Sequence, residues 1–171
     1  MKTFKYLSQV ASLCAVLLLA AFQGAYAQET KEEKSAALSA AVLSLLESKN
    51  YVFQVQSVAP RRGGMLQQSP GFKVVVSKDS VSGDLPYFGR AYNAAYGSSD
   101  GGIKFTSTNF DYKKEDRKKG GWSVKFTLKQ QKSARQLSFT IAENGSASLY
   151  VICNDRESIS YNGYLAERKG K

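Results

Sequence analysis

Hydrophobic and polar residues alternate along most of the chain, and this period of two is typical of β-strands with one buried face. The clearest case is the segment Trp122–Leu128 (WSVKFTL). The other apolar alternations lie at Tyr51–Val55, Phe72–Val76, Val81–Leu85, Ile103–Phe105, Phe110–Tyr112, Leu137–Ile141, Ala147–Cys153 and Ile159–Tyr161. The pattern predicts a mainly β protein of roughly eight strands.

No helical period separates these segments, so consecutive strands are expected to pair antiparallel through hairpins. Asn144–Gly145 is a strong hairpin turn of this kind. The apolar residues change parity between Phe105 and Phe110, which predicts a bulge near Thr108. One apolar face per strand implies one enclosed core. We therefore expect an eight-stranded antiparallel meander that closes into a small calycin-like barrel, with a two-layer sandwich as the alternative.

One segment follows helical spacing instead. Over residues 31–49, Leu38, Val42, Leu45 and Leu46 fall on one face of a helix. An apolar stripe of this kind must be buried against another element. We therefore expect an amphipathic N-terminal helix that covers the end or the side of the sheet.

The N-terminus is typical of a secretory signal. Positively charged residues precede an apolar run over 13–22, and a small-x-small pattern ends at Ala27. We expect cleavage between Ala27 and Gln28, so that residues 1–27 are the signal and 28–171 form a single domain. This predicts a secreted protein of the periplasm or cell envelope, without a transmembrane segment in the mature chain.

The chain is strongly basic, with 24 Lys and Arg against 14 Asp and Glu and a net charge of +10. Removal of Lys2 and Lys5 with the signal lowers this charge from +10 to +8. The densest run, 113–119, is expected to be an exposed hairpin tip. Such charge favours anionic partners, such as envelope glycans or lipid head groups, whereas a secreted protein is not expected to meet nucleic acid.

The residues needed for most catalytic chemistry are missing. The sequence has no histidine, the commonest general base and metal ligand. The expected mature chain keeps only Cys153, which the alternation places in the core, so neither a disulfide nor a cysteine zinc site is expected. We predict a non-enzymatic protein without metal or cofactor. The remaining enzymatic alternative is a carboxylate-based glycan hydrolase that uses Asp79, Asp84 and Asp100.

The most distinctive segment is Leu85–Tyr92 (LPYFGRAY), because its aromatic rings and guanidinium lie outside any regular period. One interpretation is a hydrophobic plug at a barrel end. The other is a pocket mouth, in which the guanidinium orients an anionic or polar group of a small amphipathic ligand. The candidate ligand-binding residues are Tyr87, Phe88, Arg90, Tyr92 and Tyr96.

Several motifs together resemble one known family. They are Asp79–Val81, Leu85–Tyr92, Gly101–Phe105, Gly145–Ala147 and Arg156–Gly163. They resemble an uncharacterised family of small secreted or envelope proteins of Bacteroidetes, catalogued as a domain of unknown function. The resemblance implies a lipocalin-like β domain and carries over no activity and no site residue. The first motif also resembles the acceptor for O-glycosylation in Bacteroidetes, which makes Ser80 a candidate modification site.

These observations favour two kinds of binding protein. The leading hypothesis is a module that binds a small amphipathic or anionic ligand at the aromatic segment, and it predicts a cavity beside Arg90. The alternative is an envelope interaction protein that works through its outer surface without a pocket, and it predicts a packed interior.

Overall fold

The computed structural model describes residues 31–68, 70–89, 102–129, 131 and 133–168. Over these ranges the chain forms one ten-stranded antiparallel sheet in the order β5-β4-β3-β1-β10-β9-β8-β7-β6, with β2 paired to β1 off this path. The strands are β1 (Tyr51–Ala59), β2 (Leu66–Gln67), β3 (Lys73–Val76), β4 (Val81–Leu85), β5 (Ile103–Ser107), β6 (Phe110–Asp116), β7 (Trp122–Leu128), β8 (Ala134–Ile141), β9 (Ser146–Cys153) and β10 (Ile159–Glu167).

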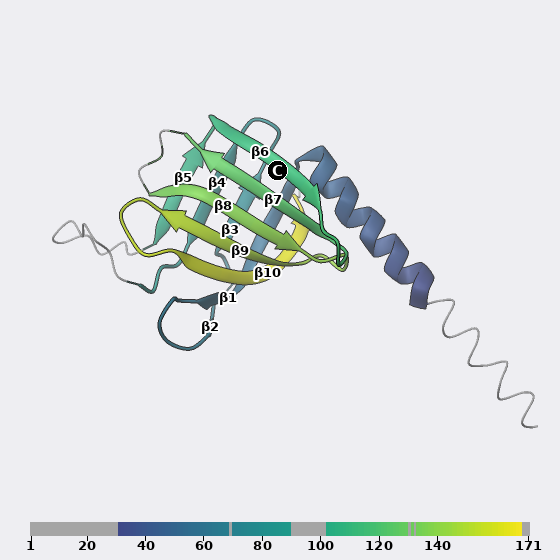
Figure 1. Cartoon of the computed structure of the whole chain (residues 1–171), viewed down its shortest axis with the longest axis horizontal. Helices are drawn as coiled ribbons and strands as arrows, with labels where there is room; N and C mark the ends of the chain where they lie inside the picture. Colours follow the sequence, from purple (N-terminus) through teal and green to yellow (C-terminus); the bar gives the residue numbers. More distant parts are fainter. Residues whose placement is uncertain (1–30, 69, 90–101, 130, 132, 169–171) are drawn as a thin grey trace, which may run out of the picture. The chain divides into compact units, whose positions relative to one another are not determined.

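The sheet nearly closes into a barrel (Figure 1). Strands β5 and β6 are the two ends of the strand order, yet only Thr108 and Asn109 separate them in the chain. The three steps from Ser107 to Phe110 reach at most about 11 Å, so both sheet edges meet at this corner. The predicted bulge near Thr108 is therefore wrong. The change of parity marks the point where the chain crosses from one edge of the sheet to the other.

The predicted antiparallel, mainly β, barrel-like fold is confirmed, with ten strands rather than about eight. The two-residue β2 is too short to show an alternation. The turn at Asn144–Gly145 joins β8 to β9 as expected: Gly145 has a φ of 84°, and the Ser146 amide donates to Asn144 Oδ1 at 3.0 Å.

Large side chains from the inner face of the sheet fill the interior. Phe126 on β7 lies at the centre of an aromatic cluster. Its ring centroid is 5.6 Å from Phe110, 5.1 Å from Tyr112 and 6.0 Å from Phe139. Most inward residues of the strands other than β2 and β6 are buried. Among the residues that the structure describes, the interior is therefore a packed core.

A helix spans residues 31–48, where the sequence predicts one over 31–49. Val42 and Leu46 are buried in the barrel core, whereas Leu38, predicted on the same face, is 46% exposed. Leu46 O accepts a hydrogen bond from Tyr112 on the β6 edge at 3.4 Å. The last turns of the helix thus lie against β6. No helix in the described part of the chain is long and apolar enough to cross a membrane.

Candidate functional site

The predicted aromatic site is described in part. Tyr87 and Phe88 follow β4 at the barrel end where Leu85 pairs with Ile103. Phe88 is 45% exposed, and Tyr87 is half-buried. The three other candidates, Arg90, Tyr92 and Tyr96, lie outside the described residues, as do Asp100 and the expected cleavage point at Ala27 and Gln28.

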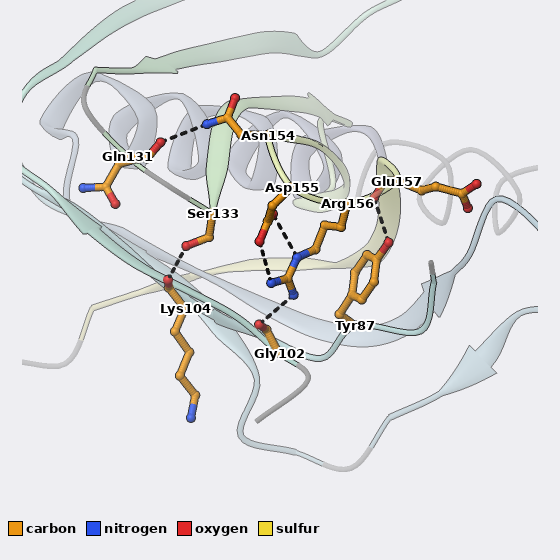
Figure 2. Close-up of polar contacts among 9 residues, drawn as sticks. All are labelled: Tyr87, Gly102, Lys104, Gln131, Ser133, Asn154, Asp155, Arg156 and Glu157. Carbon is orange, nitrogen blue, oxygen red and sulfur yellow. Dashed lines mark hydrogen bonds and ion pairs between the residues drawn. The ribbon is translucent and has the colours of Figure 1, made fainter. Parts of the chain in front are cut away.

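Tyr87 is held by the connection between β9 and β10 (Figure 2). Its hydroxyl donates to the Glu157 carbonyl at 3.1 Å, and the Arg156 guanidinium lies 5.0 Å from its ring centroid. Partial burial raises the pKa of the Tyr87 hydroxyl, which remains a donor at neutral pH. This ring therefore packs against the β9–β10 connection.

Arg156 links several residues around Tyr87 through hydrogen bonds. Its Nε and Nη2 donate to the two carboxylate oxygens of Asp155 at 3.1 and 2.9 Å, and Nη1 donates to the Gly102 carbonyl at 3.1 Å. The hydrogen bonds from Arg156 hold the pKa of the Asp155 carboxyl below its usual value. The sequence places Arg156 in a family motif, but only the structure shows that it contacts Tyr87.

The same region seals the free edge of β5 with side chains (Figure 2). Ser133 Oγ donates to the Lys104 carbonyl at 3.1 Å, and Gln131 Nε2 donates to the Thr106 carbonyl at 2.6 Å. Together with the bond from Arg156 to Gly102, the residue before β5, these bonds reach every second carbonyl from Gly102 to Thr106. We call this row the β5 seam. Side chains here take the place of a strand partner and protect an otherwise open edge.

Two further groups beside Tyr87 and Arg156 are wholly or partly buried. Tyr161 on β10 is buried, and its hydroxyl donates to the Pro86 carbonyl at 2.7 Å. Cys153, at the end of β9, is a free, half-buried thiol, and burial raises its pKa to about 11. The thiol is therefore protonated at neutral pH, whereas a nucleophilic cysteine needs the thiolate.

Of the three carboxylates considered for hydrolysis, the two that the structure describes, Asp79 and Asp84, do not converge. Asp84 lines a groove of about 440 Å³ on the outer face of β3, β4 and β5, between Lys73 and Lys104. Asp79 lines a different groove of about 480 Å³, next to Lys49 and the turn before β6. Of the part of the chain that the structure describes, no three His, Cys, Asp or Glu side chains are grouped to hold a metal ion.

Two further grooves lie on the outer face of the barrel and carry few charges. One, of about 460 Å³, runs along β1 and is lined by Gln54, Gln56 and Tyr164 among others. The second, of about 380 Å³, is lined by Gln56, Ser148 and Asn162 among others. Because Gln56 lines both, the two grooves adjoin. The sequence gives no local signal for them, since their residues come from separate strands.

The remaining surface candidates are at turns. The basic residues predicted at a hairpin tip lie at the exposed end of β6 and in the β6–β7 turn. On β6, Lys113 forms an ion pair with Glu115. Ser80, the candidate glycosylation site, lies in the turn between β3 and β4, and its carbonyl accepts from the Ser77 amide at 2.8 Å. It is partly exposed.

Comparison with known proteins confirms the resemblance seen in the sequence. The chain is similar to a solved structure described as a DUF4251 family protein from Bacteroides eggerthii DSM 20697, with 18% identity and a TM-score of 0.57, over 77% of this chain and 89% of that one. This likeness supports the fold alone. Among curated proteins, none matches. A family model described as a domain of unknown function, DUF4251, matches residues 33–165, and the chain therefore belongs to this family.

Proposed function

We propose that this protein is a non-enzymatic binding protein of the bacterial cell envelope, and that it holds its partner on the outer surface of the barrel. The observation that carries this proposal is the packed interior. Inward residues such as Phe53, Phe126 and Tyr161 are fully buried in one hydrophobic core. The adjoining grooves at Gln56, by contrast, are bordered by outward residues.

Three features support the absence of catalysis. The sequence has no histidine to act as a general base. The Cys153 thiol is protonated at neutral pH. Asp79 and Asp84 line separate grooves, whereas a carboxylate-based hydrolase needs two carboxyls facing one substrate. The signal-like residues 1–27 support an envelope location.

A second candidate is a small-ligand site at the aromatic segment. The exposure of Phe88 favours it, because a large exposed ring beside a barrel end is a ready contact for an amphipathic ligand. The contacts of Tyr87 weigh against it, since the ring and hydroxyl of this residue are already occupied by Arg156 and Glu157.

Site-specific photocrosslinking in the native host separates the two candidates. A photoreactive amino acid is placed singly at Gln67 and Thr140 on the outer face, and at Phe88 beside the aromatic segment. We expect crosslinks from the outer-face positions, and a native mass spectrum of the gently purified protein equal to the unliganded chain. Crosslinks confined to Phe88, with extra mass that leaves on denaturation, would overturn the proposal in favour of the small-ligand site.

A further inference from the structure

Charged residues are nearly absent from four neighbouring strands. Strands β1, β10, β9 and β8 lie side by side, and their only charged residues are Arg135 and Glu167. Both lie near strand ends. In contrast, β6 at the edge of the sheet contains the charged run Lys113–Asp116. In a chain with 22% charged residues, this segregation leaves one broad uncharged face.

Most of the outward residues of this face carry hydroxyl or amide groups. In one row across the strands, Asn162 on β10 pairs with Ser148 on β9, and Ser148 with Thr140 on β8. Ser148 Oγ donates to Asn162 Oδ1 at 2.9 Å. Such groups can both donate and accept hydrogen bonds without carrying charge.

Many of these uncharged amide and hydroxyl groups line the two adjoining grooves. The groove of about 460 Å³ is lined by four glutamines, Gln54, Gln56, Gln67 and Gln68, beside the ring of Tyr164. The neighbouring groove of about 380 Å³ continues from Gln56 to the row of hydroxyls, and Arg117 is the only charged residue among the described residues that line it. Each volume lies within the range typical of small-molecule sites.

Tyr164 supplies an aromatic surface to the first groove. It is 44% exposed and stands on the outer face of β10, paired with Gln54. An exposed tyrosine offers a flat apolar ring together with a polar hydroxyl. A ring beside several amides is suited to a ligand that has both apolar faces and many hydroxyls.

We infer that the two adjoining grooves, which we call the glutamine groove, bind a neutral oligosaccharide. Sugar hydroxyls match the amide and hydroxyl partners, and the C–H face of a sugar ring packs on the Tyr164 ring. This inference rests on the proposed function, because it assigns a ligand class to the outer surface of the barrel.

Other partners fit this surface less well. An acidic glycan or a lipid head group needs a cluster of Lys and Arg, whereas Arg117 is the only cation among the described residues that line the two grooves. A protein partner needs an apolar centre, whereas the glutamine groove is lined mainly by amides and hydroxyls around Tyr164. A neutral polyhydroxylated ligand is the class that needs neither charge nor a broad apolar patch.

Affinity electrophoresis of the purified protein in gels containing dextran, laminarin, xylan, mannan or soluble starch tests the inference. Heparin and polygalacturonate serve as acidic probes. We expect retardation by at least one neutral polysaccharide, and binding weakened at least about tenfold by Tyr164→Ala and by Gln56→Glu. The matched control is Tyr150→Ala. Tyr150 is similarly exposed, at 46%, on neighbouring β9, but lines neither groove, so this variant should bind as the parent does.

The inference is overturned if no neutral polysaccharide retards the protein, or if only the acidic probes do. It is also overturned if Tyr150→Ala weakens binding as much as Tyr164→Ala. Circular dichroism of each variant checks that the exposed substitutions leave the fold intact. The photocrosslinking result distinguishes failure of this inference from failure of the proposed function. Outer-face crosslinks without polysaccharide binding would refute the sugar ligand alone. The absence of outer-face crosslinks would refute the proposed function as well.

Discussion

The Tyr161 hydroxyl donates a hydrogen bond of 2.7 Å to the Pro86 carbonyl, although the two residues are 75 positions apart in the chain. This bond fastens the start of the segment after β4 to the inward face of β10. Tyr51 on neighbouring β1 is equally buried, yet its hydroxyl has no hydrogen-bond partner among the described residues. The two tyrosines therefore form a natural comparison.

Tyr161→Phe should lower the free energy of unfolding by about 1–3 kcal/mol, because it leaves the buried Pro86 carbonyl without a donor. Tyr51→Phe should leave stability unchanged or raise it by about 1 kcal/mol, because it removes a buried hydroxyl that has no partner. Urea unfolding of both variants measures the difference. Equal losses of unfolding free energy in the two variants would show that the hydrogen bond to the Pro86 carbonyl does not stabilise the fold.

Gly163→Ala should be strongly destabilising. A Cβ at Gly163 on β10 would lie 1.8 Å from the Gln54 carbonyl oxygen on β1, and backbone cannot move away as a flexible side chain can. We expect a loss of at least about 2–3 kcal/mol, measured by urea unfolding or as a lower Tm. Gly64→Ala is the control. A Cβ there meets nothing within 4 Å and φ is not positive, so a loss of similar size would contradict the steric explanation.

The Asp155–Arg156 pair should make stability depend on pH in the acid range. Hydrogen bonds from Arg156 lower the pKa of Asp155 in the folded protein. The carboxylate thus contributes stability above its unfolded pKa of about 3.9, and this contribution is lost as pH falls through the lower folded value. Asp155→Asn should be less stable than the parent at pH 6, and the difference should shrink towards pH 2. Urea titrations across this range measure it, and a constant difference would contradict the expectation.

Cys153 should react slowly with thiol reagents. Burial raises its pKa to about 11, so at pH 8 the thiolate fraction is on the order of a hundredfold lower than in an ordinary cysteine. Alkylation by iodoacetamide, followed by peptide mass spectrometry at Cys153, should be slow in the native protein and speed up with rising pH. The urea-unfolded chain is the control, and equal native and unfolded rates at pH 8 would refute the prediction.

Side-chain alternation was enough to predict the strands and the core. Residues such as Val124 and Leu149 point inward because successive side chains in a strand face opposite sides, and that information is local. Local alternation gave a wrong prediction at Thr108, because a change of parity at a sheet corner has the same pattern in the sequence as a bulge. The helix face at Leu38 was also over-predicted, because amphipathic spacing shows which face is apolar but not how many turns find a surface to cover.

The candidate site was predictable only in part. The aromatic residues after Leu85 stand out in the sequence, but their partner Arg156 does not, since nothing local links it to Tyr87. The glutamine groove has no sequence signature at all. Its walls come mainly from β1, β2, β8, β9 and β10, and only strand pairing brings Gln54 opposite Tyr164.

The sequence by itself determined which segments become the longer strands, most of the core residues, the helix over 31–48 and the lack of histidine chemistry, because each depends on residue type and short-range periodicity. The tertiary structure alone decided that β5 and β6 become opposite edges, that Arg156 completes the β5 seam, and that the uncharged strands gather on one face. These depend on strand order and register, which are fixed by how the whole sheet closes around its core rather than by any one segment.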